Sequence, residues 1–160
     1  MNSVLQDLID NLKRCDVKMA SVESCTGGMI GKILTDRAGS SSWFEGGFIT
    51  YSNDSKQKLV NVKSELLESY GAVSQQVVEA MAHGGNQIFK DAIVVAVSGI
   101  AGPDGGSEEK PVGTVWIATS FKQQVKSEKF NFSGDREAVR QATVENALKM
   151  VNDCLNHQHF

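Results

Sequence analysis

The most reactive stretch of this chain is Glu23-Ser-Cys-Thr-Gly-Gly28, a run of small polar residues that ends in two glycines. Ser24 and Cys25 both carry nucleophilic groups. Backbone N–H groups at the start of a following helix would favour an anion or a developing oxyanion. Two interpretations remain open: Ser24 is the nucleophile of a covalent hydrolase, or the segment is a glycine turn with Thr26 as the helix cap.

Cys25 is the rival nucleophile, because a thiolate at a helix start is intrinsically more reactive than a hydroxyl. No second catalytic partner for Cys25 is visible, and a small buried residue that faces the core is the better interpretation. Together with Cys15 and Cys154 it makes an odd set of three without CxxC spacing. This pattern indicates reduced thiols rather than disulfides or zinc ligands. We therefore expect no metal site.

A nucleophilic serine needs a base, and none of the three histidines suits that role. His83 lies on the polar face of an expected helix, and His157 and His159 lie in the C-terminal tail. Lys56 is the alternative base, provided that its ammonium group is desolvated enough to lose a proton near pH 7. Tyr51 lies just before it, and its hydroxyl can orient a lysine or relay a proton. A lysine at such a position is more often on the surface, so both interpretations stay open.

Two nucleotide-binding motifs are absent. A Walker loop would need glycine where Thr26 stands and Ser or Thr where Ile33 stands, and no GxGxxG fingerprint occurs. A phosphate could instead be held by the Gly39 to Ser42 loop or by glycines of the Gly99 to Gly106 loop, with charge from Arg37, Arg136 or Arg140. Each of these features also suits an ordinary loop or a solvated cation. The candidate substrate contacts that we select are Thr26, Gly27, Gly28, Gly39, Ser40, Ser41, Gly99 and Arg140.

Helices and strands must position these side chains. Apolar residues at helical spacing predict helices over 4–12, 29–36, 56–60, 64–69 and 74–90, and a last one after residue 135. The polar residues 52–55, Asn53 among them, offer capping side chains before Lys56, and Ile88 falls on the apolar, core-facing side of the helix over 74–90. Short β-prone runs predict strands over 17–22, 43–51, 91–97, 112–121 and about 126–132. This order predicts a single-domain α/β fold, a mixed sheet of about five or six strands flanked by helices.

Composition excludes several classes of protein. The 160 residues are 41% hydrophobic, and 16 basic against 19 acidic residues leave a net charge of -3, so no uniform basic surface exists to bind nucleic acid. No apolar run approaches the roughly 20 residues of a membrane span, and the start is not a secretory signal. We expect one cytoplasmic domain over residues 1–156 and an unstructured tail over residues 157–160.

Taken together, several segments in the same order resemble the CinA C-terminal-domain family, also called PncC. The matching stretches are Glu23 to Gly28, Ala38 to Phe44, Gly47 to Asn53 with Lys56, Gly71 to Ser74, Ser98 to Gly106, Lys110 to Trp116 and Ser133 to Arg136. Many family members carry a larger molybdopterin-binding-like domain in front, so the resemblance implies a stand-alone form.

The resemblance implies hydrolysis of the carboxamide of nicotinamide mononucleotide, which yields nicotinic acid mononucleotide and ammonia without metal or cofactor. The family's nucleophile falls on Ser24, and its tyrosine and lysine fall on Tyr51 and Lys56. The family is commonly dimeric or larger, so a homo-oligomer is expected. The alternative is a catalytically silent nucleotide-binding or regulatory paralogue of the same fold.

Overall fold

The computed structural model of the chain describes residues 1–157. Its centre is one five-stranded sheet in the order β2-β1-β3-β4-β5. The strands are β1 (Met19–Glu23), β2 (Phe44–Ile49), β3 (Ile93–Gly99), β4 (Thr114–Phe121) and β5 (Gln124–Asn131). The helices are α1 (Asn2–Cys15), α2 (Met29–Thr35), α3 (Asn53–Val60), α4 (Ser64–Tyr70), α5 (Gln75–Ile88) and α6 (Arg136–His157), with a 3-10 turn over Ser40–Ser42. The predicted single-domain mixed α/β sheet is confirmed.

The sheet divides into a parallel and an antiparallel part. β1 runs parallel to β2 and to β3, whereas β4 is antiparallel to both β3 and β5. The carboxyl ends of three parallel strands therefore meet at one edge of the sheet. In open α/β sheets this is the edge at which ligands bind.

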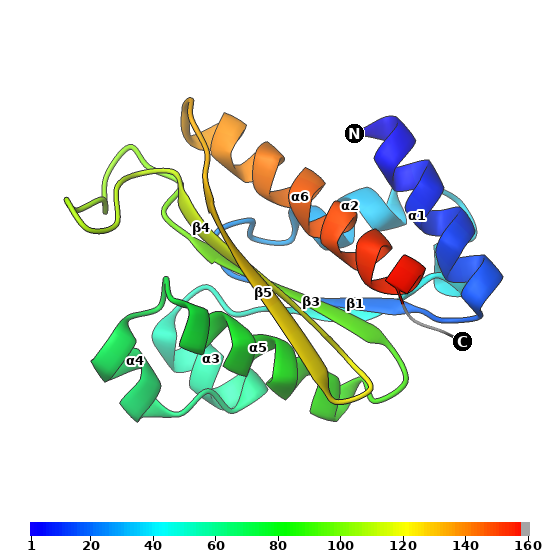
Figure 1. Cartoon of the computed structure of the whole chain (residues 1–160), viewed down its shortest axis with the longest axis horizontal. Coiled ribbons are helices and arrows are strands. Elements are labelled where there is room, and N and C mark those ends of the chain that lie inside the picture. The colour runs from blue at the N-terminus through cyan, green and yellow to red at the C-terminus, as the bar shows by residue number, and fades with distance from the viewer. Residues whose placement is uncertain (158–160) are drawn as a thin grey trace.

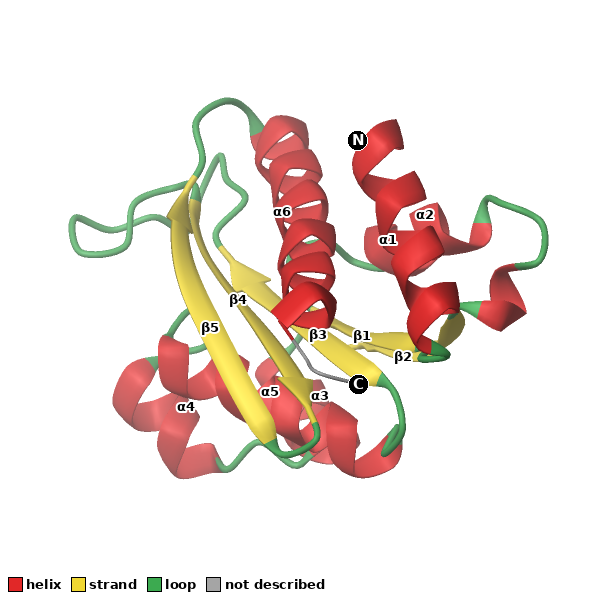
Figure 2. Cartoon of the chain, turned by 45° about the vertical axis from the view of Figure 1, so that its right-hand side comes forward, coloured by secondary structure: helices red, strands yellow, loops and turns green. Residues whose placement is uncertain are grey.

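Helices cover both faces of the sheet (Figures 1 and 2). α1, α2 and α6 lie on one face, and α3, α4 and α5 lie on the other. The central strand β3 contributes side chains to the hydrophobic cores on both faces of the sheet. Ile93, Val95 and Val97 belong to the core under α6, and Val94 and Ala96 belong to the core under α5. Side chains alternate across a strand, so a strand covered on both faces is apolar throughout its length.

Local hydrogen bonds position the two key segments. The N–H of Ser24 donates to the carbonyl of Val97 on β3 (3.1 Å), and the N–H of Thr50 donates to the carbonyl of Glu23 on β1 (2.7 Å). α3 then begins with a capping box between Ser52 and Ser55, which satisfies free N–H groups of its first turn. The chain after β2 consequently turns back, and the first turns of α3 lie beside the end of β1.

Four local predictions are wrong. Thr26 does not cap α2, because that helix begins at Met29 and Gly28 occupies the cap position. Gly28 adopts a left-handed conformation (φ 103°), which a residue without a Cβ atom reaches without strain. Tyr51 lies beyond the end of β2, and Ile88 is half exposed at the end of α5 rather than in the core. His157 belongs to α6 and not to a tail; the rest of the predicted tail, 158–160, lies outside the described residues.

None of the helices described within 1–157 has the length and apolar character to cross a bilayer.

Candidate active site

Lys56 and Ser24 meet at the carboxyl ends of β1 and β2. The Nζ atom of Lys56 lies 3.1 Å from the Oγ atom of Ser24. The same amine donates to the carbonyl oxygens of Thr50 (2.9 Å) and Tyr51 (3.4 Å). The predicted proximity of an amine and a hydroxyl is therefore confirmed, and two backbone carbonyls fix the orientation of the amine.

Lys56 is a buried lysine, not a surface one, with only 1% of its area exposed. Its Nζ atom has no carboxylate within ion-pair distance among residues 1–157. Burial disfavours the charged ammonium, so the pKa of Lys56 is lowered from its usual 10.5, against a smaller opposing effect of the neighbouring Cys25. The neutral amine is therefore more accessible than in a solvated lysine, as a general base requires.

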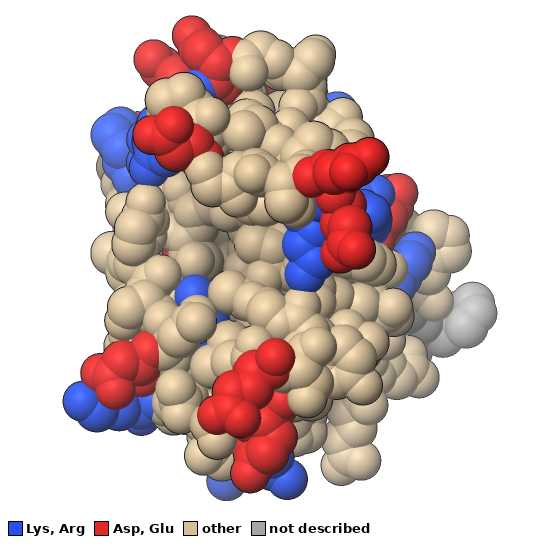
Figure 3. Space-filling view, turned by 90° about the vertical axis from the view of Figure 1, so that its left-hand side faces the viewer, with Lys and Arg blue, Asp and Glu red and all other residues tan. Residues whose placement is uncertain are grey.

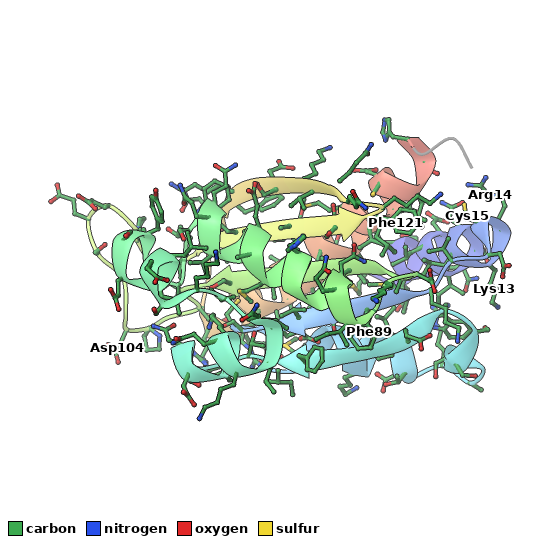
Figure 4. All side chains as sticks on the ribbon, turned by 90° about the horizontal axis from the view of Figure 1, so that it is seen from below. Lys13, Arg14, Cys15, Phe89, Asp104 and Phe121 are labelled. Atoms are coloured by element: carbon green, nitrogen blue, oxygen red, sulfur yellow. The ribbon has the colours of Figure 1, made fainter. Side chains whose placement is uncertain are left out.

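Cys25 lies beside the pair but is not activated. Its side chain is buried, and the pKa of its thiol is raised to about 11, first by burial and further by the nearby charge of Glu23. A thiol with this pKa holds almost no thiolate at neutral pH. Cys15 is far from this site: Figure 4 shows it with Lys13 and Arg14 at the end of the molecule opposite the loop of Asp104.

A cavity of about 210 Å³ opens beside Ser24 and Lys56. The residues that line it include Gly99, Tyr51, Asn53 and Arg136. The guanidinium of Arg136 donates to the carbonyl of Gly102 and to the hydroxyl of Tyr51, each at 2.9 Å. Figure 3 faces this end of the molecule, where isolated basic atoms lie in a mainly uncharged hollow and both acidic and basic groups lie around its margin. The cavity thus combines a nucleophile–base pair with one exposed cation.

The helix start after Ser24 is not a free anion site, because Glu23 already occupies it. The buried carboxylate of Glu23 accepts from the N–H groups of Gly28 (3.0 Å), Ile30 (3.1 Å) and Gly31 (2.9 Å). It also accepts from the hydroxyl of Thr26 at 2.7 Å. Thr26 and Gly28, predicted as substrate contacts, therefore face an internal anion, and Gly27 lies exposed next to Arg140.

The structure does not bring the predicted phosphate loop to the cavity. Gly39, Ser40 and Ser41 precede β2, whereas Ser24 and Lys56 lie beyond the other end of that strand. Six residues of strand span about 20 Å. Arg140 is also elsewhere, since its guanidinium donates to the carbonyl oxygens of Cys25 and Thr26, both at 3.1 Å. Of the predicted substrate contacts, Gly99 alone is among the residues that line the cavity.

Sequence reasoning missed three contributors to the site. The sequence offers both Arg136 and Arg140 as cations, and the signal that favours Arg136 is its place in the stretch Ser133 to Arg136, which carries the family resemblance. The sequence predicts only a capping role for Asn53, whereas the structure places it in the cavity lining. For Glu23 the signal is its position: an acidic residue at the end of a buried apolar strand must find several hydrogen-bond donors.

Fold and site together define a class. This is an open α/β protein with a small cavity at the carboxyl ends of its parallel strands, where a buried amine contacts a serine hydroxyl. Such a pair can generate a serine nucleophile without histidine or metal.

Comparison with known proteins identifies the family. The model of the CinA C-terminal domain matches residues 1–155, and the chain belongs to that family. It is 50% identical over 139 residues to a nicotinamide-nucleotide amidohydrolase PncC of Pseudomonas putida, with 87% of each chain covered. It is 49% identical over 141 residues to the protein of the same name in Escherichia coli K12, covering 88% of this chain and 86% of the other.

Solved structures agree with this assignment. The competence damage-inducible protein A of Klebsiella pneumoniae superposes with a TM-score of 0.94 at 32% identity, and 98% of each chain is covered. A competence/damage inducible protein of Agrobacterium tumefaciens has a TM-score of 0.92 at 40% identity, over 97% of this chain and 94% of the other.

Proposed function

We propose that this protein is an amidohydrolase that converts nicotinamide mononucleotide to nicotinic acid mononucleotide and ammonia. The observation that carries the proposal is the 3.1 Å contact between the buried amine of Lys56 and the hydroxyl of Ser24 beside an open cavity. Relatives named nicotinamide-nucleotide amidohydrolase, about half identical over most of the chain, support the choice of substrate.

In the proposed first step, Ser24 attacks the amide carbon and Lys56 takes its proton. A neutral amine has two N–H bonds and one lone pair. Donation to the carbonyls of Thr50 and Tyr51 uses the two N–H bonds, which leaves the lone pair for the hydroxyl of Ser24. The lowered pKa of Lys56 supports this role.

In the following steps, the tetrahedral intermediate collapses and the Lys56 ammonium gives its proton to the leaving amine, so ammonia departs and an ester on Ser24 remains. Water then attacks this ester, with Lys56 as base again, and releases the carboxylic acid and the free serine. No redox cofactor is needed, because neither half-reaction changes an oxidation state.

We infer that the oxyanion is held by backbone N–H groups of Cys25 and Thr26, and not by the helix start that Glu23 occupies. Among the described residues, neither N–H group donates to a backbone carbonyl, and that of Cys25 lies against its own thiol, whose pKa it lowers against the larger effect of burial. The carbonyl of Cys25 accepts from Arg140, and in a trans peptide the N–H of Thr26 points the opposite way. Arg140 thus orients a peptide group whose N–H remains available for a developing charge.

Arg136 is proposed to bind the phosphate of the nucleotide. It is exposed and lines the same cavity as Ser24. Its planar guanidinium still has N–H bonds to spare after donation to Gly102 and Tyr51. A cytoplasmic location and a homo-oligomeric assembly remain part of the proposal, and size-exclusion chromatography measures the second.

The decisive experiment is ammonia release from nicotinamide mononucleotide by the purified protein, with nicotinic acid mononucleotide identified as the other product. Ser24→Ala is expected to abolish release, and Cys25→Ala is expected to retain it. Binding of the mononucleotide without ammonia release would favour a silent binding or regulatory protein. Full turnover by Ser24→Ala would overturn the assignment of the nucleophile.

A further inference from the structure

Glu23 is a buried acid that the proposed reaction does not use. Its side chain is 1% exposed, yet five hydrogen-bond donors converge on its two carboxylate oxygens. The N–H of Gly31 and the hydroxyl of Ser21 donate to Oε1, and the N–H groups of Gly28 and Ile30 and the hydroxyl of Thr26 donate to Oε2. Five donors and no acceptor are the surroundings of an ionised carboxylate.

These contacts connect both halves of the reactive pair. The side chain of Glu23 binds the far side of the turn that begins with Ser24, including the first turn of α2. The main-chain carbonyl of Glu23 accepts from the N–H of Thr50, whose own carbonyl accepts from Lys56. One residue thus holds the segments that present the hydroxyl and the amine.

We propose that Glu23 is a positioning residue for the nucleophile: its carboxylate holds the Ser24 turn against α2 and thereby sets the approach of Ser24 to Lys56, without touching the substrate. This inference rests on the proposed function for its kinetic readout only. A displacement of about 1 Å at a reacting atom costs on the order of 100-fold in rate.

The variant Glu23→Gln tests the positioning role of the carboxylate, because glutamine has nearly the same shape as glutamate but carries an uncharged amide. Whichever oxygen becomes the amide NH₂, it meets a backbone N–H: that of Gly31 on one side, or those of Gly28 and Ile30 on the other. Hydroxyl groups can rotate to accept from an amide, but backbone N–H groups cannot. We expect kcat for nicotinamide mononucleotide to fall on the order of 100-fold with KM unchanged.

A second readout does not need the proposed substrate. A fluorophosphonate probe reacts with nucleophilic serines, and peptide mass spectrometry locates the label. Labelling of Ser24 should slow by the same factor in Glu23→Gln. If the wild type labels at Ser24 but releases no ammonia, the proposed substrate fails while Glu23 is still tested. An unlabelled Ser24 in the wild type would overturn both ideas.

One control variant separates positioning from loss of stability. Asn86→Ala removes buried hydrogen bonds to Phe89, Ala92 and Ser120 at the opposite end of the sheet. It should lower the melting temperature and leave the labelling rate unchanged. Equal slowing in Asn86→Ala and Glu23→Gln, or a wild-type rate in folded Glu23→Gln, would overturn the proposal.

A pair of variants at Thr26 applies even if Glu23→Gln does not fold. Thr26→Val removes the 2.7 Å hydrogen bond to Glu23 at nearly constant shape, and Thr26→Ser keeps the hydroxyl. We expect slower labelling and a lower kcat in the valine variant, and recovery in the serine variant. Wild-type rates in both would show that Glu23 does not position Ser24.

Discussion

The amine of Lys56 lies 3.1 Å from the hydroxyl of Ser24, although 32 positions separate the two residues in the chain. β1 ends just before Ser24, and α3 places Lys56 in its first turns. The end of β2 joins them, because Thr50 is bonded to the strand end of β1 and its carbonyl receives the amine. The pair is therefore a product of strand pairing.

The rate should rise with pH as Lys56 loses its proton. Because burial lowers the pKa of Lys56, the midpoint of kcat/KM against pH should fall below 10.5. Lys56→Met should lose activity by a factor on the order of 100 to 10,000. The measurement is ammonia release between pH 5 and 10, and a profile that is flat or falls with pH over this range would contradict the role of Lys56 as base.

Lys56 should also make stability depend on pH. Between its lowered pKa and 10.5, the unfolded chain binds the proton that the folded protein has lost, so the free energy of unfolding increases with pH. Lys56→Met has no such group. The difference in unfolding free energy between wild type and Lys56→Met should rise with pH by at most about 1.4 kcal/mol per unit. Denaturant titrations measure this difference, and repeating them in a Cys25→Ala background removes the titration of Cys25, which is coupled to that of Lys56.

Cys25 should react slowly with alkylating reagents, although it is among the residues that line the cavity. With its pKa raised to about 11, the thiol should react slowly with iodoacetamide at pH 7, more slowly than partly exposed Cys15. Peptide mass spectrometry follows each site separately. Rapid alkylation of Cys25, or loss of turnover in Cys25→Ala beyond a few-fold, would support the thiol as nucleophile.

Arg136 and Tyr51 should separate substrate binding from proton transfer. Loss of the cation in Arg136→Gln should raise KM for nicotinamide mononucleotide about tenfold and change KM little for nicotinamide riboside, which lacks the phosphate.

The variant Tyr51→Phe tests the tyrosine hydroxyl separately. It keeps the main-chain carbonyl that receives the Lys56 amine and loses the hydroxyl that is hydrogen-bonded to Arg136. We expect a change in KM; a fall in kcat alone would indicate proton relay by the hydroxyl.

Gly84 should tolerate no side chain. A Cβ atom built there would lie 1.9 Å from the carbonyl oxygen of Val60, where α5 packs beneath the end of α3. Gly84→Ala should destabilise the fold by about 1–3 kcal/mol or more, because backbone atoms must move. Gly31→Ala is the matched control within a helix: its Cβ would meet no atom closer than 3.6 Å. It should be neutral or slightly stabilising in thermal unfolding.

Much of the fold could be predicted because its signals are local. A continuous apolar run predicts β3, apolar residues at helical spacing predict α5, and the capping side chains of residues 52–55 predict the start of α3. The errors fell at element ends such as Tyr51 and Ile88, where a residue's neighbours come from other segments. The mixed sheet followed from the order of these elements alone.

The sequence by itself determined that Ser24 lies on a glycine turn after a strand and that Lys56 lies early in a helix after another. The tertiary structure decided which groups remain free to react. Arg136 and Arg140 are one helical turn apart, yet one faces the cavity and the other binds the backbone of Cys25 and Thr26. From the sequence, the start of α2 also suits an anion of the substrate, but in the fold its N–H groups donate to the carboxylate of Glu23. Hydrogen-bond donors and acceptors are shared among neighbours in space, so their availability depends on the packed fold.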